Sequence, residues 1–347
     1  MWREKQAAGW MRVTVQKTIA RARSIVMDRP ANFAAGDERW FPHWGNYKTN
    51  DLDVFLINEA NVTGHGVVFD GMELFEPSLV YPNFRSTFGT RYLLKCNLLY
   101  RKVRTDDNLC YVLAFDHWAM RNYYHWVVDT LPRLFVIKDD LPDCVVLAPA
   151  KAGRYVYDSV ETLFKPRAIL EIGRHSYVRV RNLILPRHIA ESGRHDGEIL
   201  TRMKKFILDR SPARGSISHE KIYVSRARQK MRRIRNEAEV EKLLREMGFA
   251  VVRFEGMSFW EQVELMRNTR YLVSNHGANL TNLLFMPHRG KVLEINQNVS
   301  PNLCYWSLAH STGLKYYYQL CPVVGKRDDL LVDVSLLERN VELMFRQ

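Results

Sequence analysis

The sequence has few cysteines and no long hydrophobic run. Its 347 residues include five cysteines, and no two of them have C-x-x-C spacing. Scattered thiols argue against both a zinc site and a disulfide framework, so we expect buried free thiols in a reducing compartment. No stretch approaches the roughly 18 apolar residues of a membrane span, and the N-terminus lacks the apolar core of a signal peptide.

Acidic residues are also in deficit. Lys and Arg number 51 against 38 Asp and Glu, so the surface should attract anions such as phosphorylated small molecules, anionic lipid or nucleic acid. Apolar residues make up 46% of the chain, which excludes a disordered or fibrous protein. The length suggests two domains, and a chain of this size can bury a core without a metal or disulfide.

The first 26 residues combine six basic side chains with a single acid, Glu4, and apolar residues lie between them. Such a segment can lie on an anionic membrane surface, which makes a membrane one expected partner. The alternative is a basic helix that is frayed or packed on the core. Both interpretations stay open at this point.

Patterning divides the chain. Residues 1–95 read as an N-terminal extension of irregular strands and loops packed on the first domain. Short β-rich runs with helical patterns between them predict an α/β domain over residues 96–210. These runs are residues 109–115, 144–147, 168–172 and 177–185. A polar helix is expected near 196–210, and turn-forming residues at 211–216 predict a linker.

The second half alternates strand and helix. Four strands are expected, at residues 221–225, 250–254, 271–274 and 291–295. Asn236 with Glu239, and Ser258 with Glu261, each have the spacing of a capping box at the start of a helix. This order predicts right-handed crossovers and a parallel sheet. We expect a Rossmann-like nucleotide-binding domain at 217–325 and a C-terminal helix at 326–347.

The stretch Asn122–Arg133 (NYYHWVVDTLPR) contains several side chains that can take part in catalysis or binding. On an α-helix four polar side chains share one side: Asn122, His125, Asp129 and Arg133. His125 and Asp129 are competent general bases, and the indole of Trp126 on the same side can stack on a sugar ring. Pro132 should kink the helix and disturb the place of Arg133. The alternative is an Asp129–Arg133 ion pair beside a buried histidine.

Residues 274–282 (SNHGANLTN) lie between an expected strand and an expected helix. Gly277 permits a tight turn, and the first amides of the helix, near Ala278 and Asn279, can bind phosphate. His276 can add a hydrogen bond or a positive charge, and Asn282 belongs to the same polar group. An ordinary β–α turn is the alternative.

Ser225 and Arg226 follow the first strand of this half, at the edge where α/β sheets place ligands. The planar guanidinium of Arg226 or Arg233 suits phosphate oxygens. Glu255 closes the next strand, where a carboxylate can bind a ribose hydroxyl or simply lie exposed. Residues 202–235 hold twelve Lys or Arg against two acids, but no aromatic platform or recognition-helix pattern accompanies them, so no nucleic-acid partner is expected.

Five of these stretches, taken in order, resemble glycosyltransferase family 61, which includes bacterial surface-polysaccharide enzymes and eukaryotic sugar transferases. The stretches are NYYHWVVDTLPR at 122–133, YVSR at 223–226, FEGMSFWEQ at 254–262, SNHGANLTN at 274–282 and VLEI at 292–295. The resemblance covers about residues 95–297.

The resemblance implies a GT-B fold, an α/β architecture in which two Rossmann-like domains face a cleft. It implies an inverting transferase without cofactor or metal, which moves a sugar from a nucleotide sugar, expected to be a UDP-sugar, to a glycan or lipid-linked glycan. Asp129 would be the base on the acceptor side, with His125 orienting or replacing it. Capsule or lipopolysaccharide synthesis, in the cytoplasm or at the inner membrane face, would be the setting. Rival interpretations are a GT-B-shaped pyruvyl transferase and a basic nucleic-acid-binding protein.

Overall fold

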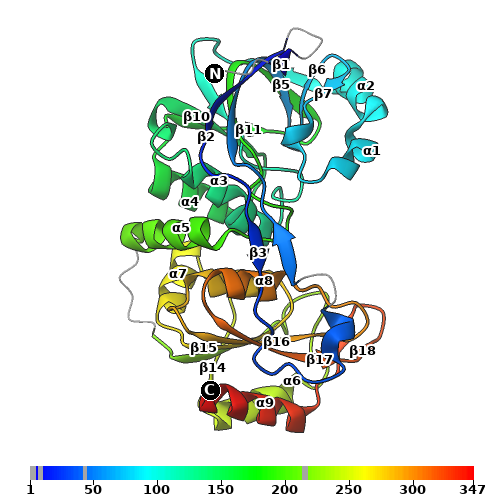
Figure 1. The fold of residues 1–347 in the computed structure, drawn as a ribbon, viewed down its shortest axis with the longest axis vertical. Helices are drawn as coiled ribbons and strands as arrows, with labels where there is room; N and C mark the ends of the chain where they lie inside the picture. Colours follow the sequence, from blue (N-terminus) through cyan, green and yellow to red (C-terminus); the bar gives the residue numbers. More distant parts are fainter. Residues whose placement is uncertain (1–4, 7–10, 42–44, 213–217) are drawn as a thin grey trace. The chain divides into compact units, whose positions relative to one another are not determined.

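The computed structural model describes residues 5–6, 11–41, 45–212 and 218–347 (Figure 1). The chain divides into two compact units. Unit 1 comprises residues 1–24 and 48–192, and unit 2 comprises residues 25–47 and 193–347. Each unit contains a sheet with parallel strand pairs and helices, which confirms the predicted α/β class.

Unit 1 is built on one mixed sheet. Its main strands, in spatial order, are β1 (Lys5–Gln6), β2 (Arg12–Thr18), β5 (Asp53–Thr63), β12 (Ser176–Pro186), β9 (Cys110–Val112), β10 (Cys144–Pro149) and β11 (Ala168–Ile172). The strands from β1 to β12 pair antiparallel, whereas β12, β9, β10 and β11 pair parallel. Shorter strands, β6 (Val68–Asp70), β7 (Glu73–Leu74) and β8 (Arg101–Val103), extend it. The parallel half therefore presents its carboxyl edge just after β9 and β12.

Unit 1 also contains helices. They are α1 (Arg85–Phe88), α2 (Thr90–Leu99), the π-helical turn η4 (His125–Thr130), α3 (Leu131–Phe135) and α4 (Arg154–Phe164). Short 3₁₀ turns lie at η2 (Glu76–Ser78), η3 (Pro82–Phe84) and η5 (Leu141–Asp143). Buried residues of α4, such as Val156 and Val160, recur at helical spacing, which is why this segment is an amphipathic helix.

Unit 2 contains the predicted parallel sheet. Its order is β14 (Ala250–Val252), β13 (Lys221–Val224), β15 (Tyr271–Asn275), β16 (Lys291–Gln297) and β17 (Lys315–Cys321). The helices are α5 (Gly197–Arg210), α6 (Glu237–Glu246), α7 (Phe259–Arg267), α8 (Cys304–Ser311) and α9 (Val334–Arg346), with 3₁₀ helices η1 (Asp37–Trp40) and η6 (Ala278–Phe285). Two small sheets are β3 (Ser24–Val26) with β4 (Asn46–Lys48), and the antiparallel pair β18 (Val323–Val324) with β19 (Asp329–Leu330).

The core of unit 2 explains its alternating pattern. Tyr223, Val273, Leu293 and Tyr317 come from neighbouring strands and are fully buried, and Val341 of α9 packs against them. Because both faces of a parallel sheet are covered by helices, its strands are apolar along their whole length. Continuous apolar runs of this kind are the feature that made unit 2 predictable.

One of the two predicted capping boxes forms. Ser258 accepts from the amide of Glu261, and the Glu261 carboxylate accepts from the amide of Ser258. Asn236 does not cap α6 with its side chain. Its amide group instead pairs with the backbone of Val332, as donor and as acceptor. The prediction that Asn236 caps α6 was therefore wrong, because its side chain binds the backbone of Val332 instead.

The units differ from the predicted domain boundaries. Residues 48–95 are part of unit 1, where β5 is a central strand, and residues 25–47 belong to unit 2. Helix α5, expected within the first domain, packs on α8 and η6 of unit 2. The C-terminal helix begins at Val334 and joins the core of unit 2. The predicted linker lies mostly in 213–217, outside the described residues.

The basic N-terminal segment does not form a surface helix where it is described. Residues Arg12–Thr18 form strand β2, which pairs antiparallel with β5. Residues 1–4 and 7–10 lie outside the described residues. Val13 and Val15 alternate with polar residues, and this period of two favours a strand over a helix.

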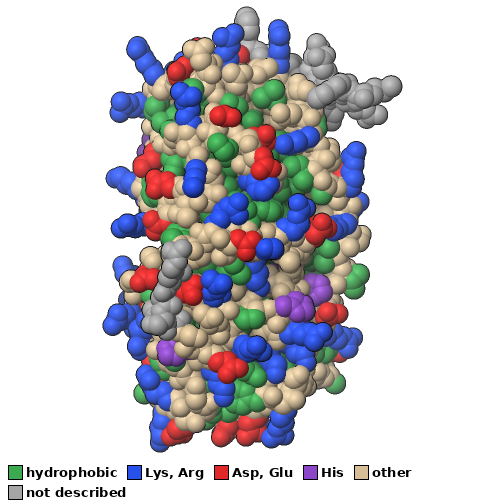
Figure 2. Space-filling view, turned by 90° about the vertical axis from the view of Figure 1, so that its left-hand side faces the viewer, with side chains coloured by type: hydrophobic (Ala, Val, Ile, Leu, Met, Phe, Trp, Pro, Cys, Tyr) green, Lys and Arg blue, Asp and Glu red, His purple; other side chains and the backbone are tan. Residues whose placement is uncertain are grey.

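Charge is dispersed on the face that Figure 2 shows. Lys and Arg side chains are scattered over it, and Asp and Glu lie between them. Within the described ranges, no helix has both the length and the apolar character that crossing a bilayer requires.

Candidate active site

The stretch that follows Asn122 contains a π-helical turn. Over His125–Thr130 the chain makes wider hydrogen-bonded turns, and the amide of Leu131 donates to the carbonyl of Trp126, five residues back. Pro132, which has no amide hydrogen, follows directly. Turns of this kind are rare and occur frequently at functional sites. Because the wider turn changes which side chains share a face, α-helical spacing describes this stretch incorrectly.

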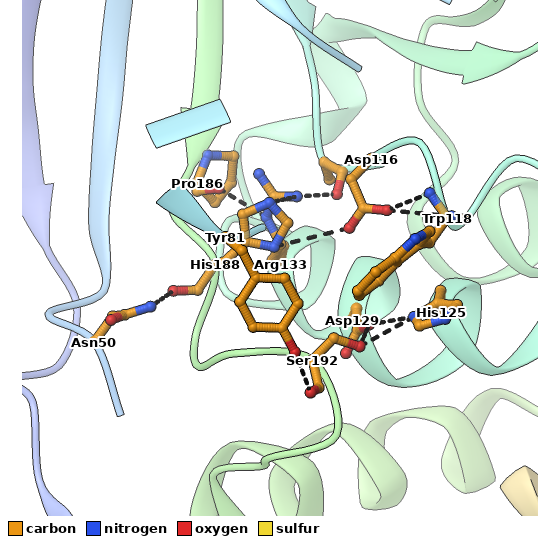
Figure 3. A network of polar contacts seen from close by, with 12 residues as sticks. Asn50, Tyr81, Asp116, Trp118, His125, Asp129, Arg133, Pro186, His188 and Ser192 are labelled. Carbon is orange, nitrogen blue, oxygen red and sulfur yellow. Dashed lines mark hydrogen bonds and ion pairs between the residues drawn. The ribbon is translucent and has the colours of Figure 1, made fainter. Parts of the chain in front are cut away.

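The π turn brings two titratable side chains together. Nδ1 of His125 lies 2.8 Å from Oδ2 of Asp129. Ser192, in the loop after β12, donates to the same oxygen at 2.6 Å and lies 3.1 Å from Nδ1 of His125 (Figure 3). The side chains of His125 and Asp129 are 16% and 9% exposed, so solvent reaches the imidazole more readily.

This geometry assigns the protons of the pair. Oδ2 of the Asp129 carboxylate is an acceptor, so Nδ1 of His125 is the donor. In a neutral ring Nε2 is then the unprotonated nitrogen. The arrangement can accept a proton at Nε2 and stabilise the resulting imidazolium through Asp129.

Aromatic rings lie beside His125. The Trp118 ring is 4.9 Å from the His125 ring at an angle of 36°. Tyr81 and Phe84 contact the other parts of Trp118 edge-on, with centroids 5.5 and 5.3 Å away. Each of these three aromatic residues is half-buried rather than enclosed. The pair His125–Asp129 is therefore bordered by a partly exposed aromatic surface.

A buried polar network supports this site from within unit 1. Asp116 accepts from the amides of Trp118 and Ala119 at 2.8 and 3.2 Å. Burial, reinforced by the negative charge of Asp129, raises the pKa of Asp116. Oδ2 of Asp116 is buried and lacks a hydrogen bond within the described residues, with Nδ1 of His188 at 3.9 Å. This network fixes the loop that carries Trp118.

Two predicted sugar-binding residues lie in the interior. Trp126 is fully buried and donates to Oγ of Ser159 at 3.0 Å. Arg133 is 1% exposed, and its guanidinium binds the carbonyls of Pro186 and Ala114 (Figure 3). Both predictions were wrong, because the ring of Trp126 packs in the core and the π turn with Pro132 rotates Arg133 into it.

Two further predictions concern the stretch 122–133. The Asp129–Arg133 ion pair considered as an alternative does not form, since Arg133 binds carbonyl groups. Asn122 is exposed, and its side chain accepts from the amide of Tyr124 at 3.0 Å. Its role toward an acceptor stays a prediction.

Burial shapes the neighbouring histidines of unit 1. Desolvation, together with the charges of His65 and His125, lowers the pKa of His117 to about 4. Desolvation and Arg174 lower the pKa of His65 to about 4 as well. Both rings are therefore neutral at physiological pH.

In unit 2, Arg226 and Gly277 meet at the carboxyl ends of β13 and β15. A Cβ atom added to Gly277 would lie 2.0 Å from Nη1 of Arg226, so only glycine allows the guanidinium to approach this backbone. Arg226 is 7% exposed. Burial, and then the charge of Arg232, lowers the pKa of Arg226. The guanidinium is thus held by packing against the turn.

Several buried polar atoms near this turn have no hydrogen-bond partner within the described residues. Among them are Nε of Arg226, Nδ2 of Asn279 and Oε2 of Glu255. Buried polar groups in native proteins are almost always paired, so such orphans indicate a missing ligand. Asn279 lies in the first turn of η6, where backbone amides are also available to an anion. Two donors and one acceptor suit a phosphate beside a sugar hydroxyl.

Ser225 and Asn282 support the turn from inside the unit. Ser225 is fully buried and donates to Glu237 at 2.6 Å. Asn282, also fully buried, donates to Gln262 at 2.8 Å. These two residues position the strand end and η6, and their burial contradicts the prediction that they contact the donor.

His276 lies between the turn and a hollow. Its Nδ1 hydrogen-bonds with the buried carboxylate of Glu294, which Tyr316 also contacts at 2.7 Å. The side chain is 12% exposed. A hollow of about 100 Å³ is lined by Arg232, His276, Asn296, Gln297, Asn302, Asp328 and Leu330. Its amide-rich lining suits a small polar ligand.

Arg233 faces a carboxylate rather than the hollow. Its guanidinium lies 3.5 Å from Oδ2 of Asp329, which is fully buried, and Arg235 lies 3.1 Å from the same oxygen. Arg232 is the neighbouring cation that lines the hollow. The spacing of the basic run could not distinguish 232 from 233. Arg233 remains a predicted phosphate ligand whose charge Asp329 partly balances.

Sequence reasoning missed Trp118, Ser192 and Arg232. All three lie outside regular helices and strands, where no periodicity marks a facing side chain. The predicted free thiols are confirmed for all five cysteines, four of them buried. Among the described residues, no three His, Cys, Asp or Glu side chains form a group that could hold a metal ion.

Known proteins resemble part of the chain. Residues 123–293 match the family model described as Glycosyltransferase 61. The EGF domain-specific O-linked N-acetylglucosamine transferase of Drosophila melanogaster is 37% identical over 97 residues, which are 27% of this chain and 18% of that protein. Its Mus musculus counterpart is 32% identical over 90 residues, 24% of this chain and 17% of that protein.

The chain thus matches less than a fifth of the length of these curated relatives. The family match begins at Tyr123 and ends within β16. It therefore includes the His125–Asp129 pair and the Arg226–Gly277 turn. Residues 123–293 therefore carry the sequence pattern of glycosyltransferase family 61, and that pattern supports a glycosyltransferase.

Proposed function

We propose that the chain transfers a sugar from a nucleotide-sugar donor to a hydroxyl group of a glycan acceptor. The observation that carries the proposal is the contact of Arg226 with Gly277, beside the unpartnered donors Nε of Arg226 and Nδ2 of Asn279. Donors held in a buried position without a partner are suited to the oxygens of a diphosphate. The family pattern across residues 123–293 supports the same reaction class.

The donor would bind to unit 2 through its diphosphate and ribose. Arg226, Asn279 and the first amides of η6, at Gly277 and Ala278, would contact the diphosphate oxygens. Oε2 of Glu255 would accept from a ribose hydroxyl. Because these donors stand where negative charge develops on the leaving diphosphate, they would stabilise the transition state without a metal ion. UDP is the nucleotide we propose.

We assign His125 as the general base and Asp129 as its positioning partner, which reverses the roles expected from the sequence. Nδ1 of His125 is engaged by Asp129, and the imidazole is the more exposed of the two groups. The acceptor oxygen would attack the anomeric carbon as the bond to the diphosphate breaks, and its proton would pass to Nε2 of His125. Attack opposite the leaving group inverts the anomeric centre.

The acceptor would be held by the aromatic surface next to this base. Trp118, bordered by Tyr81 and Phe84, presents a partly exposed indole within 4.9 Å of the His125 ring. Apolar rings beside a few polar groups are typical of ligand sites, and a sugar presents both kinds of surface. Trp118 therefore takes the role that the sequence pattern suggested for Trp126.

The setting we propose is capsule or lipopolysaccharide synthesis at the cytoplasmic face of a membrane. It rests on the resemblance of the motifs to bacterial surface-polysaccharide enzymes and on the basic excess of the chain, which favours anionic partners. A GT-B arrangement of the two units stays a prediction.

The test is a screen of nucleotide sugars for slow donor hydrolysis, combined with thermal shift for UDP, GDP and CMP. A bound nucleotide raises the unfolding temperature in proportion to its saturation. The wild type should respond to one nucleotide, and Arg226→Ala should respond much less. Consumption of phosphoenolpyruvate would favour pyruvyl transfer instead. A salt-dependent shift with DNA and none with nucleotides would favour nucleic-acid binding and contradict the proposal.

A further inference from the structure

Helix α2 of unit 1 exposes several large apolar side chains. Its inner face is buried, since Leu93 and Cys96 pack against Phe69. On the outer face Leu98 is 71% exposed and Leu99 is 75% exposed. Leu94, at 50%, and Met72, at 47%, are exposed as well. Figure 1 shows α2 at the margin of unit 1, beside β6 and β7.

These side chains form one surface. At about 100° per residue, Leu94, Leu98 and Leu99 fall on the half of α2 opposite its buried residues. Asn97 joins the helix to the neighbouring loop, because its side chain donates to the carbonyl of Gly71 and contacts the sulfur of Met72. Exposed leucines in such a group are unusual for a face that only meets water.

Basic side chains alternate with the leucines. Arg91 and Lys95 lie on the same outer half of α2, and Arg101 and Lys102 follow directly; all four are exposed. Within the described residues none of the four forms an ion pair. Residues 77–105 contain six Lys or Arg and no Asp or Glu. Of these six, Arg85 pairs with Glu76. The leucines of α2 therefore lie among basic side chains, while Asp70 and Glu73 lie on the segment that carries Met72.

We propose that this surface, the α2 patch (Met72, Arg91, Leu94, Lys95, Leu98, Leu99, Arg101 and Lys102), docks the protein on an anionic lipid bilayer. A short helix lying in the interface plane can insert leucines at the boundary of headgroups and acyl chains. Its lysine and arginine side chains then contact lipid phosphates, and each such cation contributes a factor of about five to binding.

The charge pattern favours lipid over a protein partner. The buried centre of a protein–protein interface is depleted in charged residues, and lysine in particular is rare there. In the α2 patch Lys95 lies between the leucines rather than around them. Lipid headgroups supply negative charge at every position, so this mixed face needs no matched acidic residues on the partner. The docking is independent of the proposed transfer reaction, although a lipid-linked acceptor would give it a purpose.

The experiment is co-sedimentation of the full chain with phosphatidylcholine vesicles that contain or lack phosphatidylglycerol. The wild type should bind the phosphatidylglycerol vesicles, and binding should fall as salt is raised. Leu98→Ser with Leu99→Ser should weaken binding roughly ten-fold, since apolar area no longer leaves water. Lys95→Gln alone should weaken it about five-fold.

A control removes two other exposed apolar residues. Val299 and Leu331 of unit 2 are 72% and 46% exposed, and Val299→Ser with Leu331→Ser should bind vesicles as the wild type does. Equal binding by the α2 double variant would overturn the proposal, as would a dimer in lipid-free solution that the same variant abolishes. Donor hydrolysis by the α2 variant should remain normal, so that loss of vesicle binding and loss of activity are separate results.

Discussion

Nδ1 of His125 lies 2.8 Å from Oδ2 of Asp129, one turn further along the same helix. Ser192 donates to that same oxygen, so Oδ2 of Asp129 is engaged by two partners. A carboxylate that holds one imidazole nitrogen leaves the other nitrogen to exchange protons with a substrate, and it fixes the tautomer that can do so. The pair therefore has one member that can meet a substrate and one that orients it.

Replacing the base should stop turnover and spare donor binding. We expect His125→Gln to lower kcat roughly 10²–10⁴-fold, the usual contribution of a positioned base. The nucleotide dissociation constant should hardly change, since His125 and the donor-binding atoms lie in different units. Asp129→Asn should also lower kcat, because an amide no longer selects the correct tautomer. Normal turnover in His125→Gln together with an inactive Asp129→Asn would make Asp129 the base, as the sequence suggested.

Adding one methyl group at Gly277 should weaken donor binding. The new Cβ would collide with Nη1 of Arg226 at 2.0 Å and displace the guanidinium. Overpacking of this kind costs about 1–3 kcal/mol, so the dissociation constant for the nucleotide should rise about five-fold or more. Isothermal titration measures it. Gly173→Ala is the control, since its Cβ would come no nearer than 3.2 Å, to the movable Ser176 side chain. An equal affinity in Gly277→Ala would remove Arg226 from the site.

The fold of unit 2 was predictable because each strand is enclosed by helices and therefore reads as an apolar run. The order 221–225, 250–254, 271–274 and 291–295 matches β13, β14, β15 and β16 within two residues. The unit boundaries were not predictable. Residues 25–47 lie in unit 2 and α5 packs on α8, yet nothing local in either sequence indicates its distant partner.

The candidate site was predictable where two residues are spaced so that they meet in an α-helical turn and in a π-helical turn alike. His125 and Asp129 meet at a separation of four residues despite the π turn. Arg133 was misplaced, because an α-helical wheel accumulates error across a wider turn that Pro132 follows. Trp126 was misplaced because its ring packs in the core and donates to Ser159, a tertiary contact that no helical wheel contains. Ser192 and Trp118 come from loops, and their contacts with the pair depend on tertiary structure alone.

The two tryptophans should separate substrate binding from stability. Trp118→Ala should raise KM for the acceptor about five-fold or more, because aromatic contacts of this size contribute about 1 kcal/mol or more. Its donor KM should be unchanged. Trp126→Phe should instead lower the free energy of unfolding by about 1 kcal/mol, through loss of its bond to Ser159, and leave acceptor KM alone. Steady-state kinetics and urea unfolding on both variants test these roles. If acceptor KM changed only in Trp126→Phe, Trp126 and not Trp118 would be the acceptor-binding residue.

Unit 1 should lose stability in mild acid through its buried histidines. The folded pKa of His117 and of His65 is about 4, below the usual 6.5, so the unfolded chain binds more protons between these values. The unfolding free energy therefore falls as pH drops from about 6.5 toward 4. Asp116 acts in the opposite direction, because its raised pKa lets the folded state bind the proton first.

His117→Phe isolates the histidine contribution. It keeps the aromatic contact with Phe84, whose ring lies 4.7 Å away, and removes the titrating group. Between neutral pH and about pH 5 this variant should lose less stability than the wild type, measured by urea unfolding at both pH values. An identical loss in both proteins would show that the pKa of His117 is the same in the folded and unfolded states.

Arg133 should contribute to stability and not to the acceptor site. Its guanidinium satisfies the carbonyls of Pro186 and Ala114 in the interior of unit 1. Arg133→Met keeps an unbranched apolar stem but leaves both carbonyls buried without a donor, at about 1–3 kcal/mol each. We expect the free energy of unfolding to fall by about 3–5 kcal/mol in urea denaturation. Arg154→Ala, at an 89% exposed side chain of the same unit, should change it by less than about 0.5 kcal/mol. A stable Arg133→Met protein with a raised KM for acceptor would instead restore the sugar-binding role predicted from the helical pattern.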